Sequence, residues 1–125
     1  MKLAVCARGE GLGAQTDQRF GRCPYFVLVD PVSDEVFESI RNENAAAAGG
    51  AGPQSAQLLA NRGVDAVVTG NVGPKAAYAL KAAGVEIYTG IEGTVSNSLQ
   101  KYKEGKLSLV SDATVQAHSG MKNDK

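Results

Sequence analysis

The sequence is poor in the side chains that most metal centres and catalytic thiol sites use. Its 125 residues include two cysteines, one histidine and no tryptophan. Basic and acidic side chains number 13 each, so the chain lacks the positive excess of a general nucleic-acid or membrane binder. No apolar run reaches the ~18 residues of a membrane-spanning helix. We therefore expect a globular domain that binds neither nucleic acid nor membrane.

The N-terminus also lacks the features of an export signal. Residues 1–8 contain neither a long apolar segment nor a cleavage site. Cys6 and Cys23 are too far apart in sequence for a short-range metal motif, and without export a structural disulfide is not expected. These observations predict a cytoplasmic protein with reduced thiols.

Several enzyme classes lack their required residues. Residues 9–13 (GEGLG) do not match the dinucleotide fingerprint, and no Walker lysine motif is present. The first expected strand, residues 2–7, contains no carboxylate of the kind that a two-metal nuclease needs. The only histidine, His118, lies in a polar tail, so no cysteine–histidine pair is indicated. We expect a protein that is not an enzyme.

The first part of the chain predicts an antiparallel meander. Residues 2–7 (KLAVCA) form a short apolar run typical of a buried strand, and a Gly-rich loop follows up to residue 21. Residues 25–30 (YFVLVD) and 35–41 flank a turn at 30–34, which predicts a hairpin.

The second part predicts two helix–strand units and a third helix. A helix over residues 54–62 and a strand over 64–70 follow Gly52-Pro53, and the same pattern recurs after Gly73-Pro74. Thr94 is an expected N-cap for a last helix that ends at Gly105.

These elements predict an α/β fold with a mixed five-stranded sheet in the order 3-2-1-4-5 and about three helices, which is a ribonuclease-H-like arrangement. We expect one domain over residues 1–110. Residues 111–125 are polar and are expected to form a flexible tail.

Gly-rich turns should meet where the parallel strands end. Ligands of such sheets collect outside the carboxyl ends of the strands, and amides at helix N-termini bind anions. An anionic ligand is the resulting hypothesis, although each glycine can serve only a turn or a cap. The candidate binding residues are Arg8, Phe20, Gly21, Arg22, Cys23, Gly50, Gly52, Gly70, Asn71, Val72, Gly73, Gly90 and Thr94.

Four side chains have two interpretations each. Cys6 lies in the first strand and is expected in the core, whereas Cys23 is nearer the loop and could contact a soft metal. His118 is a possible metal ligand or a solvated tail residue. Arg22 either points a cation at an anionic ligand or is a surface charge.

Four runs of sequence resemble one known family. They are residues 20–26 (FGRCPYF), 49–52 (GGAG), 63–74 (GVDAVVTGNVGP) and 83–85 (AGV). In their order and spacing they resemble the dinitrogenase iron–molybdenum cofactor biosynthesis family, of the NifX, NafY and NifB C-terminal-domain type. The resemblance covers residues 2–107.

That resemblance implies a ribonuclease-H-like fold without nuclease activity. Members bind iron–sulfur or iron–molybdenum cofactor precursors and pass them between assembly proteins, and the orange-protein branch binds a sulfide-bridged molybdenum–copper cluster. Some members carry a histidine before the Gly-Ala-Gly segment, where this chain has Ala48-Gly49-Gly50. The implied site is then a cradle of backbone amides, Arg22 and apolar surface, with Cys23 as a possible addition.

The resulting hypothesis is a non-catalytic carrier of an anionic metal–sulfur cluster of Fe–Mo, Fe–S or Mo–Cu type. Its expected partners are cluster-assembly or cluster-accepting proteins, and it is expected to be a monomer or weak homodimer. The alternative is a regulatory or protein-interaction domain that binds a nucleotide-like small molecule.

Overall fold

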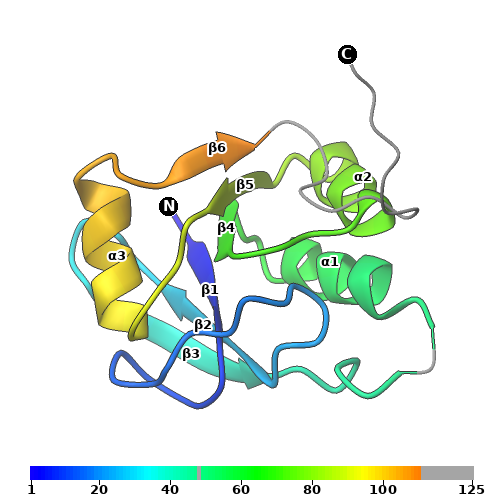
Figure 1. Ribbon diagram of the computed structural model, residues 1–125, viewed down its shortest axis with the longest axis horizontal. Coiled ribbons are helices and arrows are strands. Elements are labelled where there is room, and N and C mark those ends of the chain that lie inside the picture. Colours follow the sequence, from blue (N-terminus) through cyan, green and yellow to red (C-terminus); the bar gives the residue numbers. More distant parts are fainter. Residues whose placement is uncertain (48, 111–125) are drawn as a thin grey trace.

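A single mixed sheet organises the molecule, and its helices cover both faces. The computed structural model describes residues 1–47 and 49–110. The strands are β1 (Leu3–Ala7), β2 (Tyr25–Val29), β3 (Val36–Arg41), β4 (Ala66–Thr69), β5 (Glu86–Thr89) and β6 (Ser108–Val110). The helices are α1 (Ala51–Asn61), α2 (Pro74–Ala82) and α3 (Val95–Lys103). Figure 1 shows these elements in place.

The strand order is β3-β2-β1-β4-β5-β6, which confirms the predicted order and extends it by one strand. β1 pairs antiparallel with β2 and parallel with β4, and β4 pairs parallel with β5. All residues of β1 and β4 are buried, as expected for central strands that are covered on both faces.

The prediction of five strands was wrong by one. β6 pairs antiparallel with β5 at the sheet edge, and Thr89 lies opposite Ser108. The strand has three residues, two of them exposed, so it leaves no apolar alternation in the sequence.

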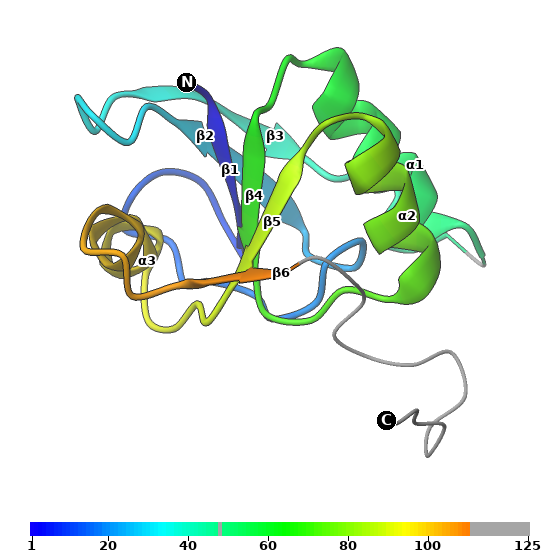
Figure 2. The same ribbon diagram turned by 90° about the horizontal axis from the view of Figure 1, so that it is seen from above.

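The helices lie on opposite faces of the sheet. Figure 2 shows α1 and α2 side by side on one face and α3 on the other. The helix predicted over residues 54–62 begins at Ala51, three residues earlier, with Gly50 in the left-handed region at φ 75° as its N-cap. Thr94 is the N-cap of α3, as predicted, and its hydroxyl accepts from the Asn97 amide at 3.1 Å. Within residues 1–47 and 49–110 the structure contains no candidate membrane-spanning helix.

A close approach joins α1, α2 and the turn before β2. A Cβ added to Gly52 in α1 would lie 2.9 Å from the Ala76 Cβ in α2. A Cβ added to Gly21, whose φ is +91°, would lie 3.0 Å from the Gly52 Cα. Only glycine fits at either position, and this contact brings the N-termini of α1 and α2 together.

Gly52→Ala tests this approach. In an unconstrained helix the change would stabilise by up to about 1 kcal/mol. Here the added methyl overlaps Ala76, so we expect the free energy of unfolding to fall by about 1–3 kcal/mol in urea titrations. Gly13→Ala is the control, because nothing lies within 4 Å of its added Cβ. An unchanged stability for Gly52→Ala would contradict the tight packing.

Candidate functional site at the N-termini of two helices

A long loop closes the carboxyl end of the sheet. This crossing loop, residues 8–23, runs from β1 over the ends of β4 and β5. The Thr16 amide donates to the Gly93 carbonyl oxygen at 2.9 Å, and the Phe20 amide donates to that of Asn71 at 3.0 Å. The Gly-rich turns after β1, β4 and β5 therefore do meet at one end of the sheet, as the topology predicted (Figure 2).

Several amides of the crossing loop and of the adjoining turns bind other backbone groups. Asn71 donates to the Gln18 carbonyl oxygen at 2.6 Å, Asp17 donates to that of Cys6 at 3.0 Å, and Val95 donates to that of Ala14 at 2.9 Å. These bonds fix the crossing loop on the sheet. They also correct the expectation of one open nest of amides, because a ligand cannot use donors that are already bound.

One pocket at this end of the sheet is lined by helix N-termini whose amides can still donate hydrogen bonds to a ligand. It lies between the first turns of α1 and α2, beside the crossing loop, and its volume is about 270 Å³. We call it the helix-terminus pocket. It is lined by Phe20, Gly52, Pro53, Gly73, Pro74, Lys75 and Ala76.

The electrostatics of the helix-terminus pocket favour an anion. The first-turn amides of an α-helix have no partner inside the helix, and neither α1 nor α2 has a side-chain cap. Neither first turn carries an acidic residue, so the positive ends of both helix dipoles remain uncompensated. Among the described residues that line the pocket, Lys75 is the charged side chain and no carboxylate is present.

Several predicted residues lie in or beside this pocket. Phe20, Gly52 and Gly73 line it directly. Gly21 packs against Gly52, and residues 70–72 lead into Gly73. Gly50 is the N-cap of α1. Sequence reasoning missed Lys75, although its place directly after Gly73-Pro74 puts it in the first turn of α2.

Other predicted residues lie elsewhere. Gly90 and Thr94 belong to the turn between β5 and α3, on the opposite face of the sheet. A separate hollow of about 400 Å³ opens on that side and is lined by residues of the turn and of α3. The N-terminus of α3 is closed by the capping box of Thr94 and Asn97, which leaves fewer free donors than α1 and α2 have.

Arg22 and Cys23 do not face the helix-terminus pocket. The Arg22 guanidinium donates to the carbonyl oxygens of Ala45 at 3.0 Å and Ala47 at 2.6 Å, so it holds the segment before α1. Cys23 is completely buried, and so is Cys6, which confirms the core position predicted for Cys6. His118 lies outside the described residues.

An ion-pair cluster in the crossing loop escaped sequence reasoning. Asp17 is 1% exposed, and its carboxylate accepts from the Arg19 guanidinium at 2.8 and 3.0 Å. Arg8 Nε lies 3.8 Å from the same carboxylate, so two exposed arginines share one buried acid. Hydrogen bonds from Arg19 lower the pKa of Asp17, and the cluster keeps a net positive charge at the end of the sheet.

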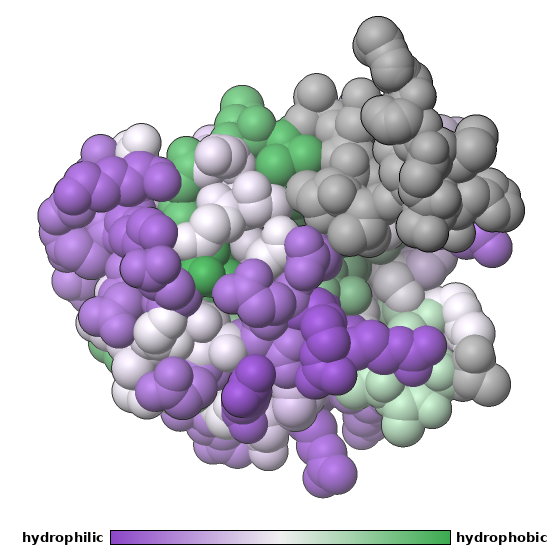
Figure 3. Space-filling model, viewed as in Figure 1, coloured by the Kyte–Doolittle hydropathy of each residue, from purple (hydrophilic) through white to green (hydrophobic). Residues whose placement is uncertain are grey.

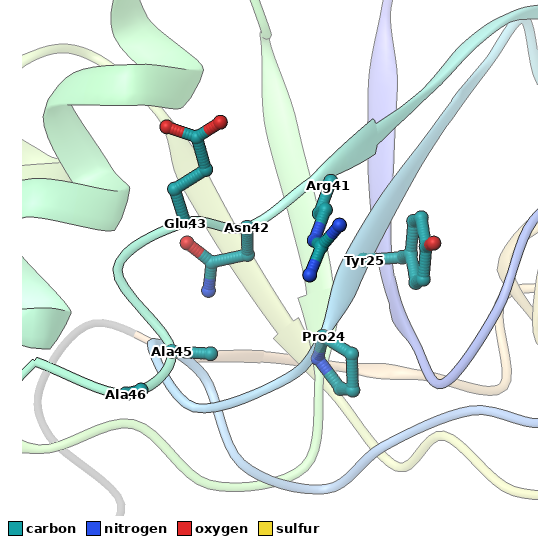
Figure 4. A pocket seen from close by; sticks show the side chains of 7 residues that line it. All are labelled: Pro24, Tyr25, Arg41, Asn42, Glu43, Ala45 and Ala46. Carbon is teal, nitrogen blue, oxygen red and sulfur yellow. The ribbon is translucent and has the colours of Figure 1, made fainter.

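A larger hollow, separate from the helix-terminus pocket, lies beside β2 and β3. It has a volume of about 580 Å³ and opens beside β2 and β3, where Tyr25 and Arg41 are register partners. Figure 4 shows these two side chains next to each other. None of the predicted site residues within the described part of the chain lines it. Its Arg41 is accompanied by the opposite charge of Glu43, so it favours an anion less than the helix-terminus pocket does.

The exposed surface is hydrophilic in one region of the molecule and paler in another. In the view of Figure 3, hydrophilic residues cover α3 and the central loops, whereas paler residues gather at the lower right, where the Ala-rich segment leads into α1. The helix-terminus pocket thus lies at the end of the molecule where the charged crossing loop meets the two uncapped helices.

The fold and this pocket define a class: small α/β domains with an anion-favouring site at the carboxyl end of a mixed sheet. Within that class, residues 1–105 match the family model described as dinitrogenase iron-molybdenum cofactor. The chain belongs to that family, which confirms the resemblance noted in the sequence.

Two solved structures and one further protein are similar to this chain over most of its length. The apo form of the orange protein from Desulfovibrio gigas is 36% identical, with a TM-score of 0.84 over 90% of this chain and 95% of that one. A Thermotoga protein provisionally described as NifB is 35% identical, with a TM-score of 0.78 over 90% and 96% of the two chains. An uncharacterised Methanocaldococcus jannaschii protein is 37% identical over 70% of this chain and 76% of its own.

Asp17→Asn tests the ion-pair cluster. The lowered pKa means that the ionised carboxylate stabilises the fold at neutral pH, and this contribution is lost as the pH falls through the folded-state pKa. We expect the variant to be less stable than the wild type at pH 7, and the difference to shrink in acid, measured by urea unfolding from pH 7 to 3.

The matched control is Glu10→Gln, which removes one negative charge from the same loop but leaves Arg19 paired. If the difference in the free energy of unfolding between Asp17→Asn and the wild type stayed constant over this pH range, the ionised carboxylate would not be the source of the stabilisation.

Proposed function

We propose that this chain is a non-catalytic carrier of a compact, anionic metal–sulfur cluster, which it holds at the helix-terminus pocket. The cluster is of the Fe–Mo cofactor-precursor, Fe–S or Mo–Cu sulfide type. The observation that carries this proposal is the meeting of two uncapped helix N-termini and Lys75 around one small pocket. Membership of the dinitrogenase iron-molybdenum cofactor family supports a metal–sulfur cargo.

The size of the pocket supports a compact ligand. Its volume of about 270 Å³ lies just below the range of about 300–1,000 Å³ typical of small-molecule sites. A cluster of a few metal and sulfide ions fits such a space better than a nucleotide, whose base, sugar and phosphates need more room. This favours the carrier over the alternative of a nucleotide-binding regulatory domain.

The chemistry of the lining supports binding without direct metal coordination. In the described residues no three histidine, cysteine or carboxylate side chains come together to hold a metal ion. A cluster whose metals are already saturated by sulfide needs hydrogen-bond donors and a matching charge instead. The first-turn amides of α1 and α2 and the Lys75 ammonium can supply these, while the Phe20 ring adds apolar contact.

The remaining predicted residues have supporting roles in this proposal. The turn made by Gly70, Asn71 and Val72 sets the start of α2, because the Phe20 amide donates to the Asn71 carbonyl oxygen. Gly21 allows α1 to approach, and Gly50 begins that helix. Arg8 adds positive charge from the crossing loop, at 66% side-chain exposure.

A partner protein would have to approach the pocket to deliver or accept the cluster. Tyr78 lies three residues after Lys75 on α2, so both residues share one side of the helix. Its side chain is 77% exposed, and exposed tyrosines are frequent anchors of protein interfaces. We propose that a cluster-assembly or cluster-accepting protein docks over Tyr78.

Lys75→Glu tests the carrier function. Purified protein is titrated anaerobically with tetrathiomolybdate, with and without Cu(I), and separately with Fe²⁺ and sulfide. After desalting, metal content and visible absorption report the bound cluster. We expect the wild type to retain one of these clusters and the variant to bind it about tenfold more weakly, because the substitution reverses the charge at the pocket. Raised salt should weaken wild-type binding as well.

The matched control is Lys106→Glu, the same charge reversal at an exposed lysine outside the pocket. It should bind like the wild type. A wild-type protein that stays colourless and free of metal under all these conditions would overturn the carrier proposal. A nucleotide that raises the melting temperature in the same preparation would support the regulatory alternative.

A further inference from the structure

The sheet has a free edge at β3. This strand pairs with β2, and no other strand of the described chain pairs with it. The amide of Asn42, directly after β3, donates to the Pro24 carbonyl oxygen at 2.8 Å, so the Asn42 backbone faces β2. Backbone groups alternate in direction along an antiparallel strand, so those of Ile40 also face β2, whereas those of Ser39 and Arg41 face away from the sheet.

The regular part of this edge is short. The register between β2 and β3 shifts between Leu28 and Val29, which leaves Phe37 as an extra residue in β3. Such a bulge bends the strand and interrupts its pairing. Residues 38–41 remain regular, and their outward-facing N–H and carbonyl groups can bind one short extended segment of another chain.

A hollow lies on each face of the sheet beside this edge. Ile40 lines a hollow of about 450 Å³ together with Leu58 of α1. Arg41 is the next residue of the strand and therefore points to the other face, where it lines the hollow of about 580 Å³ beside Tyr25 (Figure 4). The two hollows meet at the end of β3, where Arg41 and Glu43 border both. Side chains of an added strand would alternate between the faces and enter the two hollows in turn.

Arg41 favours an acidic neighbour on its face. Its side chain is exposed and makes no ion pair within the described part of the chain. Figure 4 shows the Glu43 carboxylate turned away from the Arg41 guanidinium, which leaves the guanidinium open to another acid. Opposite charges on directly facing residues of neighbouring strands stabilise the pairing. An added strand therefore fits best with an acidic side chain opposite Arg41.

The other face favours apolar neighbours. Ile40 and Leu58 supply apolar surface to the hollow on that side. The Glu38 carboxylate on the same side is already paired with the Arg62 guanidinium at 2.7 Å. The side chains of an added strand that point to this face therefore fit best if they are apolar.

We propose that β3 binds an extended segment of a partner protein in which acidic and apolar residues alternate. The segment adds to the sheet as an antiparallel strand, with its backbone bonded to Ser39 and Arg41 and its acidic side chain paired with Arg41. This surface is separate from the helix-terminus pocket, because no residue that lines the pocket belongs to β3.

A second copy of β3 matches this edge less well. If two copies paired through their outward-facing residues, Ser39 of one would lie opposite Arg41 of the other. Each guanidinium would then face a neutral hydroxyl, and the two arginines would be diagonal neighbours on one face. The charges therefore favour an acidic partner segment over self-pairing.

Two synthetic peptides test the charge pattern. Fluorescein-labelled Glu-Val-Glu-Val-Glu-Val-amide and Lys-Val-Lys-Val-Lys-Val-amide are titrated with the wild-type chain, and fluorescence anisotropy measures binding. We expect the glutamate peptide to bind at least about tenfold more tightly than the lysine peptide, which would place a cation opposite Arg41. Arg41→Glu should reverse this preference. Lys106→Glu, a charge reversal outside β3, should keep the wild-type preference.

The outward-facing amide of Ser39 is tested separately. Ser39→Pro removes this N–H and places a ring on the free edge, but it removes no hydrogen bond to β2. Ser39→Ala is the matched variant, because it keeps the N–H and loses only the hydroxyl that accepts from the Gly11 amide at 3.0 Å. We expect Ser39→Pro to bind the glutamate peptide at least about tenfold more weakly than Ser39→Ala does. Circular dichroism checks that both are folded, and if Ser39→Pro unfolds, the reversal in Arg41→Glu still decides.

The proposal is overturned if neither peptide binds, if Arg41→Glu keeps the wild-type preference, or if Ser39→Pro and Ser39→Ala bind equally. A wild-type dimer that dissociates in Ser39→Pro, seen by analytical ultracentrifugation, would also overturn it, because a second copy would then occupy the edge. The titrations contain no metal or sulfide, so their failure leaves the cluster carrier intact. Failure of cluster binding in turn leaves the strand addition at β3 intact.

Discussion

The close backbone contact at Gly52 determines the geometry of the candidate site. The Ala76 methyl on α2 lies where a side chain on Gly52 would have to go, and the Gly52 backbone lies where a side chain on Gly21 would have to go. Because no side chain separates these segments, the first turns of α1 and α2 start next to each other and beside Phe20. Two helix dipoles then point their positive ends at one small volume, which is what makes it favourable for an anion.

The crossing loop decides which amides remain open to a ligand. Its hydrogen bonds to the turns after β4 and β5 use donors such as those of Thr16 and Asn71. It is itself held by the Asp17–Arg19 ion pair and by Asn42, which donates to the carbonyl oxygens of Gly21 and Cys23. The first turns of α1 and α2, where no side chain caps the amides, keep donors that a ligand can use.

The strand order and helix starts could be predicted because they depend on local patterns. Apolar runs such as residues 66–69 mark central strands, and Gly73-Pro74 and Thr94 mark helix starts. β6 could not be predicted, because three residues at a sheet edge owe their structure to pairing with β5. The roles of Arg22 and Asp17 also escaped prediction, since they depend on which distant groups the folded loop brings near. The family resemblance, which rests on the order of several motifs, was confirmed.

Mapping a bound cluster onto individual backbone amides tests the central claim most directly. Isotopically labelled protein is titrated anaerobically with the cluster it retains, and amide resonances are followed by NMR. We expect the largest changes at Gly52, Lys75 and Ala76, whose amides lie in the first turns of α1 and α2. Changes centred instead on Gly93, Asn97 and Gln100, in the hollow beside α3, would contradict it.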